Sequence, residues 1–154
     1  MTLHSINPFN GETLEQLDAT STAGVEAALA AAEVAATSWA ERPFKERATL
    51  LGSVAGLLRE RRSDLARMIT REMGKLIGEA EAEIEKCALV CDYYAERAFD
   101  DGFLADESIG SDASRSLVAF QPLGPLLAVM PWNFPFWQVF RCAAPALAAG
   151  NTLL

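Results

Sequence analysis

The chain has 154 residues, of which 51% are hydrophobic, and this is enough for one domain with a buried core. Its formal net charge of −8 argues against a nucleic-acid-binding protein, because such proteins need a basic surface to neutralise phosphates. No apolar run reaches the ~18 residues of a membrane span. No secretory signal accompanies the three cysteines, so we expect a cytoplasmic protein with reduced thiols.

Residues 1–20 are predicted to be extended, with a turn at the Asn-Pro and Asn-Gly pairs of INPFNGET. Ser21 and Thr22 are candidate N-caps of a first helix, which Arg42-Pro43 ends. The apolar stripe of this helix consists of Val25, Leu29, Ala32, Ala36 and Trp39.

Two further helices follow. The first of them ends at Met73-Gly74, and Ser63 is a candidate cap for its second half. Its apolar face consists of Leu50, Val54, Leu57, Leu58, Leu65, Met68 and Ile69. The stripe of the next helix consists of Ile77, Ile84, Ala88, Cys91 and Tyr94. Such stripes are typical of helices packed into a core.

The cysteines do not form a recognisable metal site. Cys87 and Cys91 share a helical face, but the only histidine, His4, lies far away in the chain. We therefore predict no zinc or other metal site, and we interpret these cysteines as small buried residues.

A polar excursion occupies residues 100–116, and LVAFQPLG after it predicts a strand. Residues 126–130 form a continuous apolar run, which is typical of a strand buried on both faces of a parallel sheet. Residues 134–149 predict a helix with Pro135 near its start, and Pro145 should kink or end it. Gly150-Asn151 closes this helix and TLL begins a second strand.

The order strand, helix, strand predicts a βαβ unit and an α/β fold class. Such a unit takes roughly 30 residues, and 29 are present from Leu126 to Leu154. We therefore expect the chain to stop within its second parallel strand.

Pro131-Trp132-Asn133 follows the buried strand directly. Ligands of open α/β sheets bind outside the carboxyl ends of the strands, so this turn is a candidate site. The Asn133 amide can stabilise charge on a carbonyl oxygen, or it can simply cap the next helix. Trp132 can pack on a planar ligand or fill the core. Arg141, eight residues after Asn133, can bind an anion or remain exposed to solvent.

Several common catalytic patterns are missing. The chain contains no Ser/His/Asp set, no P-loop and no Gly-x-Gly-x-x-Gly after a strand. No cysteine lies in a recognisable nucleophile setting. The residues alone therefore predict a cleft-bearing α/β protein whose reaction they do not define.

Three segments resemble the aldehyde dehydrogenase family in the same order: INPFNGE, REMGKLIGEAEAEIEKCALVCDYYAE and PLGPLLAVMPWNFPFWQVFRCAAPALAAGNTLL. ITREMGK, CDYYAE and MPWNFPFWQVFR are most similar to bacterial succinate-semialdehyde dehydrogenases. The resemblance implies oxidation of an aldehyde, succinate semialdehyde in this subfamily, to a carboxylic acid with NAD or NADP. In the family, a cysteine thiolate attacks the aldehyde and a glutamate-activated water completes the reaction.

The resemblance also assigns roles to individual residues. Asn133 matches the oxyanion-hole asparagine, which changes our interpretation from helix cap to catalytic donor. Met130, Pro131 and Trp132, together with Asn133, match positions that line the dinucleotide site. Arg141 matches an arginine linked with the substrate carboxylate, a task that suits a bidentate guanidinium.

The chain departs from the family pattern in important ways. The nucleophilic cysteine, the general-base glutamate and the glycine-rich turn all correspond to positions after residue 154. Cys87, Cys91 and Cys142 match none of these, so we assign them no catalytic role and expect the chain alone to be inactive. Leu76 replaces a common proline in a loop. The alternative hypothesis is a non-catalytic truncated paralogue or a decayed reading frame.

The resemblance further implies a division of the chain and its partners. Residues 1–99 would be the amino-terminal helical part of the cofactor-binding domain. Residues 100–121 would be an oligomerisation-type excursion, and 122–154 the start of a Rossmann-like parallel sheet. The partners implied are a small aldehyde and other copies of the full-length enzyme, with no nucleic acid and no membrane.

Overall fold

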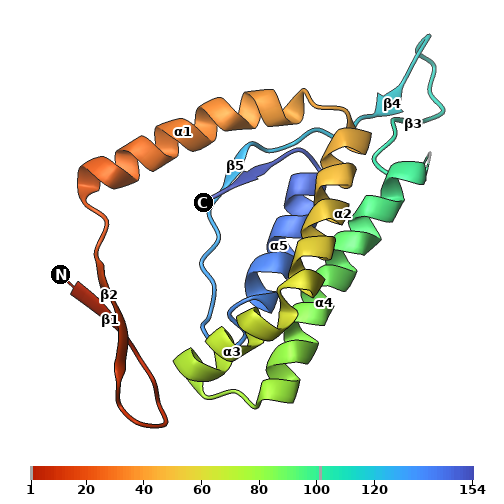
Figure 1. Ribbon diagram of the computed structural model, residues 1–154. Coiled ribbons are helices and arrows are strands. Elements are labelled where there is room, and N and C mark those ends of the chain that lie inside the picture. The colour runs from red at the N-terminus through yellow and green to blue at the C-terminus, as the bar shows by residue number, and fades with distance from the viewer. Residues whose placement is uncertain (1, 101) are drawn as a thin grey trace.

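The computed structural model describes residues 2–100 and 102–154. In this described part of the chain, a helical body and a long crossing helix, α1, are accompanied by three separate pairs of strands (Figure 1). In Figure 1 the amino-terminal hairpin lies at one end of α1 and the strands β3 and β4 project from the opposite side of the body. None of the helices in the described part of the chain is both long and apolar enough to cross a bilayer.

The amino-terminal hairpin confirms the predicted extended segment. β1 (Thr2–Ile6) and β2 (Thr13–Asp18) pair in antiparallel fashion. In the turn between them, the Asn7 carbonyl accepts from the Gly11 N–H at 2.8 Å. Gly11 has a φ of 75°, a left-handed conformation that glycine adopts without a steric penalty. The Asn-Gly pair therefore predicts this turn because the turn needs a left-handed residue at Gly11.

The first helix begins where the sequence predicts. α1 (Thr22–Ala40) is capped by Ser21, whose Oγ accepts from the Gly24 N–H at 3.1 Å. Ala32 and Ala36 of the predicted stripe are buried, whereas Val25 and Leu29 are about half exposed. Only the carboxyl half of α1 therefore contributes to the core.

The predicted second helix is two helices. α2 (Phe44–Glu60) ends at Arg61, whose φ of −96° and ψ of 9° break the helix, and α3 (Arg62–Met73) follows at once. Both helices pack on α4 (Ile77–Glu96). Because the chain changes direction at Arg61, α2 and α3 each turn a different face toward α4. The expected Ser63 cap is wrong, because Ser63 lies inside α3 and its Oγ accepts from Arg67. The predicted glycine stop is confirmed, since Gly74 has a φ of 74°.

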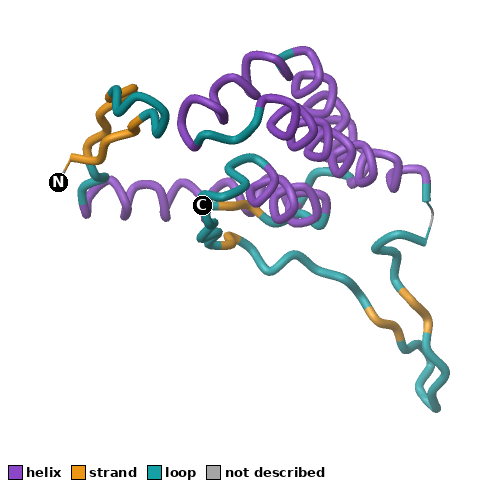
Figure 2. Tube along the Cα trace, turned by 90° about the horizontal axis from the view of Figure 1, so that it is seen from below, coloured by secondary structure: helices purple, strands orange, loops and turns teal. Residues whose placement is uncertain are grey.

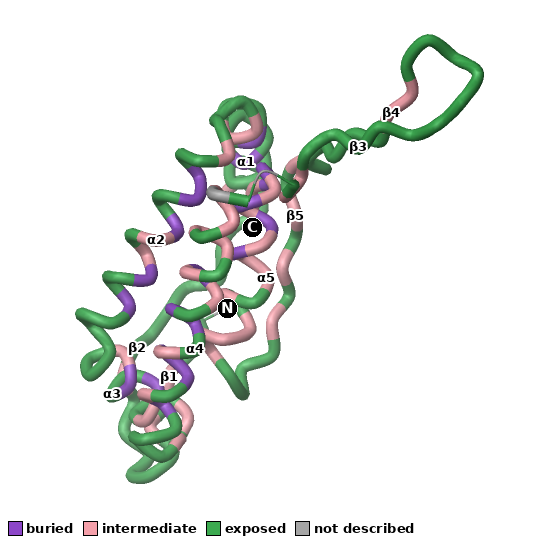
Figure 3. Tube along the Cα trace, turned by 90° about the vertical axis from the view of Figure 1, so that its right-hand side faces the viewer, coloured by how far each residue is buried: buried purple, intermediate pink, exposed green. Residues whose placement is uncertain are grey.

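The core lies between α2, α3, α4 and α5 (Trp137–Ala148), and the buried positions line the inner faces of these helices (Figure 3). Its largest fully buried side chains are Ile69, Ile84, Cys87 and Cys91. Within the predicted stripe of α4, Ile84, Ala88 and Cys91 are buried and Tyr94 is partly buried. Ile77 is 47% exposed, because it lies in the first turn of the helix.

An arm extends from the body after the short 3-10 helix η1 (Arg97–Phe99). Its strands β3 (Glu107–Ser108) and β4 (Leu117–Val118) pair in antiparallel fashion and lie far from the helices (Figure 2). The predicted strand LVAFQPLG is therefore only two residues long. The arm is almost entirely exposed, so nothing in the described chain holds more of it in a sheet.

The predicted βαβ unit is present. β5 (Pro125–Leu126) pairs in parallel with β6 (Thr152–Leu153), and α5 connects them. The expectation of burial on both faces is wrong, because Leu127 and Val129 are 78% and 84% exposed. Residues 126, 128 and 130 face the helices, and no described element covers the opposite face.

The helix of this unit differs from the prediction at its start. α5 begins at Trp137 instead of residue 134, so Pro135 precedes it. Pro145 does not end the helix, which continues to Ala148. Gly150 then turns the chain with a φ of 92°, as the Gly-Asn stop predicts.

Candidate active site at the turn before α5

The candidate site follows the carboxyl end of a parallel strand, as predicted. Hydrogen bonds from Ala128 N–H to the Leu154 carbonyl, at 2.8 Å, and from Leu154 N–H to the Leu126 carbonyl, at 2.9 Å, extend the pairing of β5 with β6. The chain then leaves the sheet and passes through residues 131–136 before α5 begins. This is the position at which open α/β sheets bind ligands.

Asn133 is exposed in this turn. Its side-chain amide makes no hydrogen bond with any residue that the structure describes. The alternative that Asn133 caps the next helix is wrong, because the N-cap position belongs to Phe136, three residues later. Asn133 therefore presents two N–H donors outside the carboxyl end of the strand pair.

The amino end of α5 is instead capped by a residue that sequence reasoning missed. Glu83, on α4, accepts hydrogen bonds from the backbone N–H groups of Phe136, at 2.9 Å, and Trp137, at 3.0 Å. Its other carboxylate oxygen forms an ion pair with the Lys75 Nζ. The available signal was an acidic residue on the buried face of α4, between Ala80 and Cys87.

Trp132 and the residues after Asn133 border a pocket against α3. Its lining consists of Met68, Ile69, Glu72, Met73, Trp132, Pro135 and Phe136. Trp132 is 77% exposed, so the alternative that it fills the core is wrong. Met130 is partly buried and Pro131 is exposed, and the described lining includes neither of them, nor Asn133, nor Arg141.

Arg141 lies on α5, one helical turn after Trp137. Asn133 lies four residues before α5 begins, so the two residues do not share this helix. The Arg141 side chain is exposed, and its Nη1 lies 3.5 Å from the Gln138 Oε1. The Nζ of Lys86 on α4 lies 4.0 Å from the centre of the Trp137 ring. This cation–π contact holds Lys86 against the first turn of α5.

The thiols on α4 are poorly suited to nucleophilic attack. Burial, followed by the charge of Glu83, raises the pKa of Cys87 to about 12. Burial and the charge of Asp92 raise the pKa of Cys91 to about 11. Both groups are therefore thiols at neutral pH, whereas the attacking species is the thiolate.

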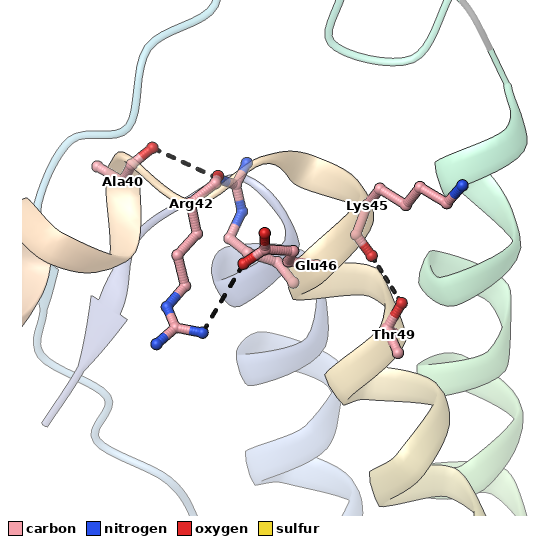
Figure 4. Close-up of polar contacts among 6 residues, drawn as sticks. Ala40, Arg42, Lys45, Glu46 and Thr49 are labelled. Carbon is pink, nitrogen blue, oxygen red and sulfur yellow. Dashed lines mark hydrogen bonds and ion pairs between the residues drawn. The ribbon is translucent and has the colours of Figure 1, made fainter.

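The carboxyl end of α5 is held by Arg47 of α2. This buried guanidinium donates from Nε to the Ala148 carbonyl, at 3.1 Å, and from Nη1 to the carbonyls of Ala40 and Arg42. Burial lowers the pKa of Arg47. Figure 4 shows these surroundings, in which the exposed side chain of Arg42 reaches Glu46 instead, with a separation of 4.0 Å. Arg47 thus joins the ends of α1 and α5.

Asn151 fixes the segment that leads into β5. Its Oδ1 accepts from the N–H groups of Leu123, at 2.7 Å, and Gly124, at 3.1 Å, and its Nδ2 donates to the Ala146 carbonyl. Asn151 is buried, so these bonds replace water that the backbone groups would otherwise bind. The strand that leads to Asn133 is therefore tied to the end of α5.

Comparison with known proteins identifies the family. The model of the aldehyde dehydrogenase family matches residues 1–154, and the chain belongs to this family. The fold agrees, because succinic semialdehyde dehydrogenase from Streptococcus pyogenes, solved in complex with NADP+, superimposes with a TM-score of 0.90. That structure is 34% identical, and the match covers 97% of this chain and 33% of that one.

Curated relatives point in the same direction. The "Probable succinate-semialdehyde dehydrogenase, NADP(+)" of Synechocystis is 50% identical over 151 residues, covering 98% of this chain and 33% of the relative. A succinate semialdehyde dehydrogenase of Escherichia coli that uses NAD(P)+ is 42% identical, covering 97% of this chain and 32% of the relative. The chain thus spans about a third of the length of the relatives that it matches.

Proposed function

We propose that this chain forms part of an NAD(P)-dependent aldehyde dehydrogenase that oxidises succinate semialdehyde to the carboxylic acid. The observation that carries the proposal is the unpartnered Asn133 amide outside the carboxyl end of the β5–β6 pair. Membership of the aldehyde dehydrogenase family and relatives named for this substrate support it.

In this proposal Asn133 stabilises negative charge on the aldehyde oxygen. The charge develops when a nucleophile attacks the carbonyl carbon, and an N–H donor that is already in place stabilises it without reorganisation. The α4 thiols have raised pKa values, so neither Cys87 nor Cys91 serves as that nucleophile. The attacking cysteine and the general base would come from residues outside this chain.

Arg141 would bind the carboxylate at the other end of the substrate. Its exposed guanidinium lies on the helix that begins four residues after Asn133. A planar guanidinium can hold a carboxylate through two parallel hydrogen bonds. Asn133 and Arg141 would then orient the two ends of one small acid.

Met130, Pro131, Trp132 and Asn133 would line the dinucleotide site. The chemistry of the set fits a nicotinamide nucleotide, because the exposed Trp132 ring offers an apolar face and Asn133 an amide donor. The bound cofactor supplies the acceptor for the hydride that leaves the substrate. This chain supplies one wall of the site and orients the aldehyde against it.

A chimeric enzyme tests the proposal. The 154 residues of this chain would replace the matching segment of the Escherichia coli relative, which supplies the remainder of the fold. The chimera should reduce NADP+ or NAD+ with succinate semialdehyde, and Asn133→Ala should lower kcat by about 10²–10³-fold. Arg141→Ala should raise KM for succinate semialdehyde more than KM for propanal.

Two controls make the test selective. Gln138→Ala removes the neighbour of Arg141 on the same helix but no proposed substrate contact, so it should leave both KM values nearly unchanged. The 154-residue chain alone should show no turnover. An Asn133→Ala chimera with normal kcat would overturn the oxyanion assignment. Turnover by the 154-residue chain alone would contradict the claim that the nucleophile lies outside these residues.

The arm at residues 100–121 would serve assembly of the whole enzyme. Its paired strands project from the body, and Ile109, Val118 and Phe120 are exposed hydrophobic residues on it. Removal of residues 103–120 from the chimera should therefore reduce its mass in sedimentation equilibrium to that of a single copy.

A further inference from the structure

The amino end of α5 has no cap of its own. The first N–H groups of a helix lack partners within it and need an acceptor from elsewhere. At the N-cap position, Phe136 has no polar side chain to supply one. The acceptor is Glu83, 53 residues earlier in the chain, whose Oε1 lies 2.9 Å from the Phe136 nitrogen and 3.0 Å from the Trp137 nitrogen.

The capping carboxylate is buried and paired. The side chains of Glu83 and Lys75 are only 1% and 7% exposed, and they form an ion pair. The Lys75 Nζ also lies 3.8 Å from the centre of the Phe134 ring. The pair therefore contacts residues 134, 136 and 137, which follow Asn133 directly.

Packing alone does not explain this pair. Replacing a buried ion pair by apolar residues of similar size is often neutral or stabilising, so such a pair is weak evidence for stability. The faces of α4 and α5 already meet through apolar side chains, including Phe136, Trp137 and Phe140. What apolar side chains cannot supply is directional hydrogen bonds that fix where α5 begins.

We propose that Glu83, held by Lys75, is a positioning residue that fixes the amino end of α5 and thereby the orientation of the Asn133 amide. The catalytic importance of this orientation rests on the function proposed above. The positioning itself does not, because it is a property of the folded chain. A donor in an oxyanion site must be held within a fraction of an ångström, so a rigid support matters.

Amide hydrogen exchange in the ¹⁵N-labelled 154-residue chain tests the positioning. In Glu83→Ala, exchange at the Phe136 and Trp137 amides should accelerate at least about tenfold more, relative to wild type, than exchange at amides in the core of α4. The side-chain NH₂ signals of Asn133 should shift or broaden at the same time. Unchanged exchange at Phe136 and Trp137, or unmoved Asn133 signals, would overturn the proposal.

Two further variants separate positioning from general loss of structure. Glu85→Ala is the matched control, because Glu85 lies on the same helix but pairs with the exposed Arg59. It should leave the Phe136, Trp137 and Asn133 signals unchanged. Glu83→Gln keeps the side-chain length and an acceptor oxygen but loses the charge. It should restore part of the protection lost in Glu83→Ala, and it provides the measurement if the alanine variant does not fold.

Exchange in Glu83→Ala and turnover in the Asn133→Ala chimera give independent readouts of positioning and of the oxyanion role. Normal exchange in Glu83→Ala together with impaired turnover in the Asn133→Ala chimera would reject positioning and retain the oxyanion role. Altered exchange in Glu83→Ala together with normal turnover in the Asn133→Ala chimera would retain positioning and reject the oxyanion role.

Discussion

The two ends of α5 are held by opposite kinds of side chain. A buried carboxylate, Glu83, accepts from the backbone N–H groups at the amino end, and a buried guanidinium, Arg47, donates to the carbonyl of Ala148 at the carboxyl end. Both charges have the sign that the helix dipole favours. The difference lies in the counter-charge, because Glu83 pairs with Lys75 whereas Arg47 contacts neutral carbonyls.

This difference predicts unequal costs when each anchor is broken. Removing one partner of a buried ion pair leaves an uncompensated charge in the interior, whereas removing a donor from carbonyls leaves only neutral acceptors unsatisfied. The end of α5 near Asn133 should therefore be the more sensitive of the two.

Lys75→Met should have the largest effect. Methionine has a side chain of similar length to lysine but no charge, so the Glu83 carboxylate stays buried without its cation. The free energy of unfolding should fall by about 3–5 kcal/mol. Urea denaturation followed by circular dichroism measures this, and Lys75→Met in a Glu83→Gln background should cost much less. A loss below that of Arg47→Met would reverse the proposed ordering.

Arg47→Met should cost less. It removes the hydrogen bonds to Ala148, Ala40 and Arg42 but leaves no buried charge behind. The free energy of unfolding should fall by about 1–3 kcal/mol. The same denaturation experiment applies, with the exposed Arg42→Met as the matched control, for which almost no change is expected.

The buried thiols give a pH-dependent test of the Glu83 charge. Burial first, and Glu83 second, raise the pKa of Cys87 from 9.0 to about 12. Because the unfolded chain loses the thiol proton first, stability is fully present below pH 9 and falls as the pH rises toward the folded pKa. The loss is at most about 1.4 kcal/mol per pH unit for each thiol.

Denaturation between pH 8 and 10.5 measures this loss. The slope should be smaller in Cys87→Ala, which has one thiol fewer to titrate. In Glu83→Gln the Cys87 pKa should fall, because a negative charge near the thiol is gone. A thiol absorbance titration near 240 nm that gives the same Cys87 pKa in both proteins would contradict the proximity of a charged Glu83.

Ser21→Ala should have the smallest effect. Ser21 caps α1 through one hydrogen bond to Gly24 at a surface position. The expected loss is about 1 kcal/mol, the usual cost of removing a serine N-cap. Ser21→Asp should retain most of the stability. A loss equal to that of Lys75→Met would mean that local and long-range caps contribute alike.

Much of the fold could be predicted from the sequence because its determinants are local. The Asn-Gly turn, the Ser21 cap, the Gly74 stop and the alternation of buried and exposed positions along α4 each depend on residues only a few positions apart. The βαβ order and the location of Asn133 after β5 follow from the same local patterns. The break at Arg61 had only an indirect signal, the candidate cap Ser63 two residues later, and Ser63 does not cap α3.

The position of the candidate site could be predicted from the sequence, but the contacts around it could not. The turn 131–133 follows a strand in both the prediction and the structure, yet the sequence could not decide whether Asn133 caps α5. That choice was made by Glu83, which occupies the capping role from another helix. Burial of residues 126–130 was overestimated for a related reason, since an apolar run does not reveal which face another element covers.

Local sequence signals were enough to place the Asn-Gly turn, the Ser21 cap of α1, the Gly74 stop and the strand, helix, strand order of the βαβ unit. Those features arise from backbone sterics and hydrophobic periodicity within a few residues. Which polar groups meet the two ends of α5 depends instead on tertiary packing. Their partners lie 53 and 101 residues away along the chain, so only the packing of α2, α4 and α5 brings them within hydrogen-bonding distance.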